Sequence, residues 1–342
     1  MRSMRPYDAF LLISFGGPEG EDEVIPYLEN VTRGRNIPRE RLEEVGEHYF
    51  LFDGVSPINQ QCRDLLAAIT TDFESAGIDL PIYWGNRFWT PLLTDTLAQM
   101  HKDGVRRVLA VATSAYCNWS SRTAYLEDIA RARAELGDDA PEVDLVRPFY
   151  DHPGFVEPLV EHTRAALERL PAERREKVRL LFSAHSIPTK MAEDSGGAEQ
   201  GFGPEGAYGD QLAEVARLVA GQLDREYPFE VVYQSRSGPP SQPWLEPDIN
   251  DRLEELADED VSAVVVVPHG FVSDHMEVKF DLDVEARETA RKLDLAYELA
   301  SSPGTHPAFV SMMTELVREY TEGGERKRLG QLPPCAEERC GC

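Results

Sequence analysis

The sequence predicts an α/β protein built from two similar, doubly wound parallel domains. Three observations support this fold class. Short apolar runs of strand length alternate with stretches of helical periodicity, which is typical of parallel sheets covered by helices. The chain has 342 residues, enough for two domains. The two halves also resemble each other, because residues 11–14 and 180–183 both end a strand and lead within a few residues to a proline.

Six apolar runs are predicted strands, because each has strand length and ends in loop residues. They are residues 9–14, 82–84, 108–112, 178–183, 231–233 and 264–267. We expect one domain at residues 1–150 and a second at 151–306, since prolines punctuate the chain near this boundary. Residues 307–342 are expected to form a helix with a one-sided apolar stripe that returns across the domains, followed by a cysteine-bearing tail.

Composition and charge limit the classes of partner. The net charge of −26 disfavours binding to nucleic acid and adsorption to anionic lipid. No apolar run approaches the roughly 20 residues of a membrane helix, and the N-terminus shows no cleavable signal. We therefore expect a cytoplasmic protein without integral membrane association, and a monomer.

The first candidate for chemistry is His185, in the loop after the predicted strand at residues 178–183. Ligands of open parallel sheets bind outside the carboxyl ends of the strands. A neutral imidazole there can bind a first-row metal or accept a proton near neutral pH. A histidine that only caps a turn is equally compatible with this position.

A second candidate is the row of carboxylates Glu277, Asp281 and Glu285. Their i, i+4, i+8 spacing places them on one face of a predicted α-helix, in a line about 12 Å long. In so acidic a protein, a solvated acidic face is the more common explanation. A track for a hydrated divalent cation is the alternative, and it is favoured because the row begins directly after a strand-end loop.

Other polar and aromatic residues give weaker signals. Trp244 lies in a stiff, proline-rich loop and is either a packed tryptophan or a wall beside a planar ligand. Arg33 and Arg35, with Ser56 and Asn59, supply positive charge and hydrogen-bond donors suited to carboxylates. Surface arginine is common, so this pattern alone is not specific.

The cysteines suggest a metal site. Cys335, Cys340 and Cys342 crowd the last eight residues, and three thiolates need a fourth ligand from the folded body. Cys117, in a strand-end loop, is the better candidate; Cys62 has the spacing of a core residue on an amphipathic helix. A [2Fe–2S] cluster, a structural zinc site and an unstructured tail all remain open.

Taken together, these motifs resemble the ferrochelatase family over essentially the whole chain. The resemblance rests on residues 183–188, 233–247 and 270–277, supported by residues 14–18 and 33–35. It implies two Rossmann-like domains that hold a tetrapyrrole in the cleft between them. It also implies that His185 and Glu277 face each other at the macrocycle centre as catalytic residues and ligands of the substrate Fe²⁺, with Asp281 and Glu285 as a relay.

The resemblance assigns further roles. Phe15 matches a position on the opposite macrocycle face that is tyrosine in some members, so a potential axial oxygen ligand is missing here. The expected porphyrin contacts are Phe15, Arg33, Arg35, Ser56, Asn59, Tyr116 and Trp244. The tail is similar to the class of members with a [2Fe–2S] cluster, whose ligands would be Cys117, Cys335, Cys340 and Cys342, with Cys62 as the alternative to Cys117.

The expected function is insertion of Fe²⁺ into coproporphyrin III, giving coprohaem, in haem biosynthesis. Membrane-associated members of the family carry an apolar lip, whereas residues 20–35 are polar here, which suits a water-soluble porphyrin with four propionates. A protoporphyrin IX ferrochelatase is the nearest alternative. A chelatase for another metal, a non-catalytic haem or porphyrin carrier, and an iron-sensing protein are further alternatives.

Overall fold

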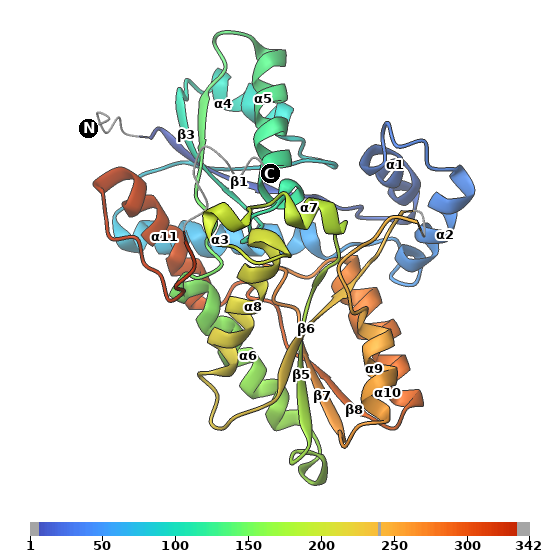
Figure 1. Cartoon of the computed structure of the whole chain (residues 1–342). Helices are drawn as coiled ribbons and strands as arrows, with labels where there is room; N and C mark the ends of the chain where they lie inside the picture. The colour runs from blue at the N-terminus through green and yellow to red at the C-terminus, as the bar shows by residue number, and fades with distance from the viewer. Residues whose placement is uncertain (1–6, 239–240, 334–342) are drawn as a thin grey trace.

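The structure is a computed structural model that describes residues 7–238 and 241–333. It contains two four-stranded parallel sheets, one from each half of the chain (Figure 1). The first sheet has the order β2 (Ile82–Asn86), β1 (Ala9–Ser14), β3 (Arg107–Ala112), β4 (Glu142–Leu145). The second has the order β6 (Phe229–Gln234), β5 (Val178–His185), β7 (Ala263–Val267), β8 (Ala296–Leu299). The same strand order in both halves confirms the predicted fold class.

The six predicted strands are present, and the sequence analysis missed β4 and β8. Both are four-residue strands that lie at an edge of their sheet. Glu142 and Asp144 interrupt the apolar pattern of β4, and Glu298 interrupts that of β8. An edge strand is shielded less than a central one, so its sequence keeps polar residues and its apolar signal is weak.

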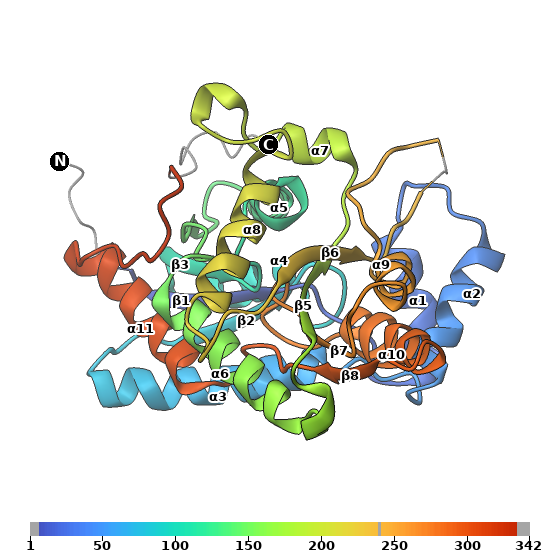
Figure 2. The ribbon, with the colours of Figure 1, turned by 60° about the horizontal axis from the view of Figure 1, so that its bottom comes forward.

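Helices flank both sheets (Figure 2). In the first half they are α1 (Glu21–Val31), α2 (Arg39–Phe50), α3 (Ile58–Ala76), α4 (Leu93–Lys102) and α5 (Ala124–Leu136). In the second half they are α6 (Pro153–Arg169), α7 (Thr189–Glu193), α8 (Gly206–Ala220), α9 (Ile249–Ala257), α10 (Arg287–Lys292) and α11 (Pro307–Glu322). The described chain also contains the π-helices η1 (Trp119–Thr123) and η4 (Glu277–Ala286) and the 3₁₀ turns η2 (Ala172–Arg174) and η3 (Ala198–Gln200).

Strand alternation divides the core into layers. In β1, Phe10 and Leu12 point to one cluster while Leu11 and Ile13 point to another, as the period of two requires. The first of these clusters, which we call the central core, also contains residues of β5, α3, α6, α8 and α11. The outer face of the first sheet is covered by α4 and α5, and that of the second by α9, η4 and α10.

The last helix connects the two halves. α11 packs against α3 of the first half and α6 of the second. Asp72 on α3 accepts hydrogen bonds from Ser311 at 3.2 Å and Thr314 at 2.5 Å on α11. Because the central core is continuous through both halves, domain boundaries at residues 150 and 306 stay a prediction. Within the described ranges, no helix is both long and apolar enough to cross a membrane.

Candidate active site

The ends of two neighbouring strands bring His185 and Glu277 together. His185 is the last residue of β5, and Glu277 begins η4 after β7, the strand that pairs with β5. The Nε2 atom of His185 lies 3.8 Å from Oε1 of Glu277, and the two side chains are 37% and 32% exposed. The imidazole and the carboxylate therefore share one solvent-accessible space at the carboxyl edge of the second sheet.

The surroundings of His185 determine which ring nitrogen is available. Its Nδ1 atom lies against the carbonyl oxygen of Ser186, which can only accept a hydrogen bond, so we place the proton on Nδ1. The lone pair of Nε2 then faces Glu277. Two acceptors so close together favour a cation between them, either a proton or a divalent ion that accepts imidazole and carboxylate ligands.

A serine that the sequence analysis did not single out links the acidic residues. Ser235 follows β6 and has a φ of 62°, a left-handed conformation that is uncommon for serine. Its Oγ atom lies 3.2 Å from Oε2 of Glu277 and also contacts Oδ2 of Asp281. Burial and the negative charge of Glu277 raise the pKa of Asp281 to about 8. Asp281 therefore holds a proton at neutral pH, one hydroxyl away from Glu277.

The helix that carries these carboxylates differs from the prediction. The i, i+4 spacing predicted an α-helix, but η4 is a π-helix over Glu277–Ala286 and becomes α-helical only at Arg287. A π-helix closes i→i+5 hydrogen bonds and is wider than an α-helix, so residues four apart fall short of a full turn. Glu285 continues the row toward solvent, and its pKa is raised by desolvation and by the charge of Asp248.

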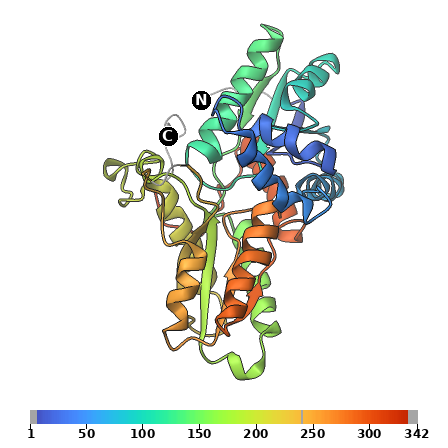
Figure 3. The same ribbon diagram turned by 90° about the vertical axis from the view of Figure 1, so that its right-hand side faces the viewer.

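The helices α1 and α2 lie on the side of the molecule that faces the viewer in Figure 3, and α2 contacts η4, which carries the acidic row. His48 on α2 stacks on Phe280 of η4, with ring centroids 3.7 Å apart and planes at 13°. Burial and the nearby negative charge of Glu277 raise the pKa values of Tyr27 and Tyr49. The sequence analysis missed both tyrosines, because they belong to two separate helices and nothing in the sequence shows that they meet.

Of the predicted porphyrin contacts, some are accessible and others are buried. Phe15 follows β1 and packs against Phe88 with ring centroids 4.6 Å apart. Arg33 and Arg35 are exposed, and neither side chain makes an ion pair with any residue in the described ranges. Ser56 and Asn59 are both buried, and their predicted contact with a propionate stays a prediction. Asn59 donates to the carbonyl of Gly17 at 3.0 Å, so this side chain supports the loop after β1.

The two remaining predicted contacts are Tyr116 and Trp244. Tyr116 is buried, and its hydroxyl donates to the carbonyl of His269 at 2.9 Å. Trp244 is half-buried beside Pro188, with which it forms an isolated bridge. Its indole N–H is buried and has no hydrogen-bond partner in the described chain. Trp244 therefore carries a buried donor that no described residue satisfies, in the loop that follows Ser235.

The predicted cluster ligands lie partly inside the described residues. Cys117 is buried, and its backbone N–H donates to Oε1 of Gln211 at 2.8 Å. Cys117 packs with Phe202, Ala207 and Leu332, so the C-terminal segment passes close to it. Cys335, Cys340 and Cys342 lie outside the described residues.

The other internal cysteine is less suitable as a ligand. Cys62 lies in the central core on α3, and burial raises the pKa of its thiol to about 11. A metal ion could reach this sulfur only by entering the apolar central core, where a buried cysteine is inert. Within the described ranges, no group of three or more His, Cys, Asp and Glu side chains is arranged to hold a metal ion. Cys117 is disulfide-bonded in this structure, so a four-thiolate site with Cys117 as its internal member would need that bond reduced and the tail cysteines as further ligands.

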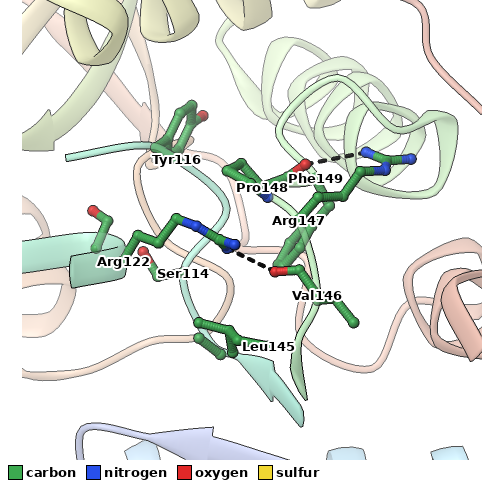
Figure 4. Close-up of a pocket in the computed structure, with 10 residues that line it drawn as sticks. Ser114, Tyr116, Arg122, Leu145, Val146, Arg147, Pro148 and Phe149 are labelled. Carbon is green, nitrogen blue, oxygen red and sulfur yellow. Dashed lines mark hydrogen bonds between the residues drawn. The ribbon is translucent and has the colours of Figure 1, made fainter. Parts of the chain in front are cut away.

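A small pocket lies elsewhere, at the carboxyl ends of β3 and β4 (Figure 4). Arg122 and Arg147 line it, but Arg122 donates to the carbonyl of Val146 at 2.7 Å and Arg147 to that of Pro148 at 3.1 Å. Neither His185 nor Glu277 lines this pocket. We therefore place the candidate chemistry at His185 and Glu277, where the reactive groups converge, and not in this pocket.

Sequence comparisons give independent evidence. The family model described as Ferrochelatase matches residues 7–321. A coproporphyrin III ferrochelatase of Streptomyces coelicolor is 52% identical over 338 residues, covering 97% of this chain and 89% of the relative. One from Nocardia farcinica is 50% identical over 345 residues, covering 97% and 96%. A ferrochelatase of Rhodopirellula baltica is 48% identical over 349 residues, covering 99% and 95%.

The structural comparison agrees in fold. The solved structure of SirB from Bacillus subtilis with Fe³⁺ matches 94% of this chain and 98% of its own, with a TM-score of 0.57 and 13% identity. At this low identity the likeness shows a shared fold alone. The family model, however, matches most of the chain, and several relatives are about half identical over nearly its full length. The chain therefore belongs to the ferrochelatase family.

Proposed function

We propose that this protein inserts Fe²⁺ into coproporphyrin III, with His185 and Glu277 as the catalytic residues. The observation that carries the proposal is the 3.8 Å separation of the imidazole Nε2 and the carboxylate of Glu277 at the carboxyl edge of the second sheet. The names of the similar Streptomyces and Nocardia proteins support the choice of porphyrin. Metallation replaces two pyrrole N–H protons by one Fe²⁺, so the site must bind a metal and remove two protons.

In the proposed mechanism, the porphyrin is held in a distorted, saddled shape that exposes its nitrogen lone pairs, with strain supplied by binding energy. Nε2 of His185 accepts a pyrrole proton, since its lone pair is free. Glu277 would hold the arriving Fe²⁺ and accept the second pyrrole proton once the ion has passed to the pyrrole nitrogens. Ser235 then connects Glu277 to Asp281, from which Glu285 continues toward water.

The porphyrin contacts follow from what is accessible. Phe15 and Trp244 would contact the macrocycle, and Arg33 and Arg35 would bind propionates, since both guanidinium groups are exposed. Phe15 has no oxygen atom, so it cannot serve as an axial metal ligand. A cytoplasmic location and a monomeric state also remain predictions from the sequence.

We expect kcat/KM for metallation of coproporphyrin III to exceed that for protoporphyrin IX by at least about tenfold, because two additional propionates each gain a charge-assisted contact. Steady-state absorbance assays with ferrous iron under anaerobic conditions measure both values.

The double variant Arg33→Ala, Arg35→Ala should raise KM for coproporphyrin III about two- to fivefold, as expected for solvent-exposed ion pairs. Equal kcat/KM for the two porphyrins would favour a protoporphyrin IX enzyme.

We also propose that Cys117 and the three tail cysteines hold a [2Fe–2S] cluster. The support is the position of Leu332 against Cys117, only three residues before Cys335. When bound, such a cluster would supply redox chemistry and a covalent link between tail and body. Anaerobically purified protein should contain about two iron and two sulfide ions per chain, and Cys117→Ala should lose both. Zinc without sulfide would indicate the structural-metal alternative.

A further inference from the structure

The segment that leads to the tail cysteines is anchored to the body although it has no regular secondary structure. Residues 323–333 follow α11, which ends at Glu322 (Figure 2). Near the end of α11, Glu319 forms an ion pair with Arg147, with distances of 2.8 Å from Nε to Oε1 and 3.0 Å from Nη2 to Oε2. The same guanidinium donates to the carbonyl of Lys327 at 3.1 Å. The buried side chain of Arg147 therefore holds the turn that follows α11 in place.

A second set of contacts fixes the next five residues. Asp151 is buried, and its Oδ2 accepts from Nε of Arg328 at 2.6 Å while its carbonyl accepts from the backbone of Leu329 at 2.8 Å. Oε1 of Glu214 on α8 accepts from the backbone of Gln331 at 2.9 Å. Nη2 of Arg328 donates to the carbonyl of Leu332 at 2.6 Å, which makes the segment turn back on itself.

These contacts end close to Cys117 and only a few residues before the first tail cysteine, Cys335. Leu332 packs with Cys117, and Cys335 follows three residues later, a span of at most about 11 Å. About 13 residues separate Cys335 from the last residue of α11, whereas only about three separate it from Leu332, the last residue held by these contacts. The entropy of loop closure makes the shorter loop about tenfold more favourable to close.

We propose that Asp151, Glu214 and Arg328 form a tail clamp that positions the tail cysteines beside Cys117. This inference rests on the proposed cluster and adds the residues that determine how firmly it is held. None of the three is a cluster ligand or belongs to the porphyrin site. Arg328 is the informative position, because Asp151 keeps Arg147 at 3.9 Å when Arg328 is removed and its buried carboxylate is not left without a cation.

The test compares Arg328→Ala with the matched control Arg326→Ala in the full chain. Arg326 is exposed two residues earlier and forms no ion pair with a described residue. We expect Arg328→Ala to lose iron to a chelator about tenfold faster than the wild type, with the thermal unfolding midpoint changed by only a few degrees. Arg326→Ala should lose iron at the wild-type rate. Glu214→Ala should behave like Arg328→Ala, whereas Glu214→Gln, which keeps an acceptor for Gln331, should retain the cluster.

Hydrogen exchange separates the clamp from the cluster. In wild-type protein stripped of metal, the amides of Leu329 and Gln331 should exchange slowly, and Arg328→Ala should make both exchange faster. If the purified wild type contains no iron and sulfide while this difference is found, the cluster proposal fails and the clamp stands. If Arg328→Ala retains wild-type exchange and wild-type iron loss, the clamp is wrong.

Discussion

Replacing His185 with alanine is expected to lower kcat for iron insertion by at least about 100-fold, the range typical for loss of a general base. The reason is specific to Nε2, whose lone pair faces Glu277 while Nδ1 is used by the carbonyl of Ser186. The neighbouring imidazole of His275 cannot replace it, because its Nδ1 already accepts from the backbone of Glu277 at 3.3 Å. Porphyrin binding, measured by fluorescence quenching, should change by less than about threefold, since the large macrocycle surface dominates affinity.

The matched control for this variant is His101→Ala. His101 lies on α4, which covers the outer face of the first sheet, and its Nδ1 contacts the carbonyl of Asp139. Its removal should leave kcat unchanged. Iron insertion by His185→Ala within about tenfold of the wild-type rate would show that another group accepts the pyrrole protons.

Replacing Glu277 with glutamine is expected to reduce kcat by about 100-fold or more. The substitution keeps the size of the side chain and an oxygen that can accept from Ser235, but it removes the negative charge beside Nε2 of His185. A neutral amide neither accepts a proton nor attracts Fe²⁺ as a carboxylate does. Initial rates at saturating porphyrin and varied Fe²⁺ measure both effects, with Glu288→Gln on the exposed face of α10 as the control.

The same variant has a second readout in the pH dependence of stability. The pKa of Asp281 is about 8 in the folded chain because of burial and then the charge of Glu277, whereas in the unfolded chain it is near its ordinary value of 3.8. Folding is therefore favoured below pH 4 by this group, and that contribution is lost as pH rises to about 8. In Glu277→Gln, which lacks the Glu277 charge, the free energy of unfolding should fall less over this pH range. Urea unfolding of the metal-free wild type and of Glu277→Gln at pH 5 and pH 8.5 measures how much unfolding free energy each protein loses over this range. An identical loss in the two proteins would mean that the carboxyl groups of Asp281 and Glu277 are not coupled.

The sequence predicted the parallel sheets well because central strands are buried on both faces and read as continuous apolar runs. Residues 264–267 are an example, since the strand β7 that contains them is fully buried. It did not predict the edge strands β4 and β8, which carry acidic residues. It also did not predict that η4 is a π-helix. An i, i+4 row of carboxylates is compatible with both an α- and a π-helix, so the spacing of Glu277 and Asp281 could not reveal that η4 is wider.

The candidate site was partly predictable for a related physical reason. His185 ends β5 and Glu277 follows the neighbouring strand β7 of the same sheet, so the rule for strand ends predicted that they lie in the same region. Ser235 also follows a strand, but one serine in a proline-rich loop has no distinguishing pattern. Ser56, Asn59 and Tyr116 are expected porphyrin contacts, and the structure shows that all three are buried, which their positions in the sequence did not predict. Burial of a polar side chain depends on tertiary partners such as Gly17 and His269, which no local pattern specifies.

The most direct test of the account is a crystal structure of the full chain with coproporphyrin III bound. We predict that Nε2 of His185 and the carboxylate of Glu277 both reach the centre of one macrocycle, with at least Nε2 within about 3.5 Å of a pyrrole nitrogen, as reaction requires. A porphyrin bound elsewhere, or a macrocycle centre that only one of these two side chains can reach, would contradict it.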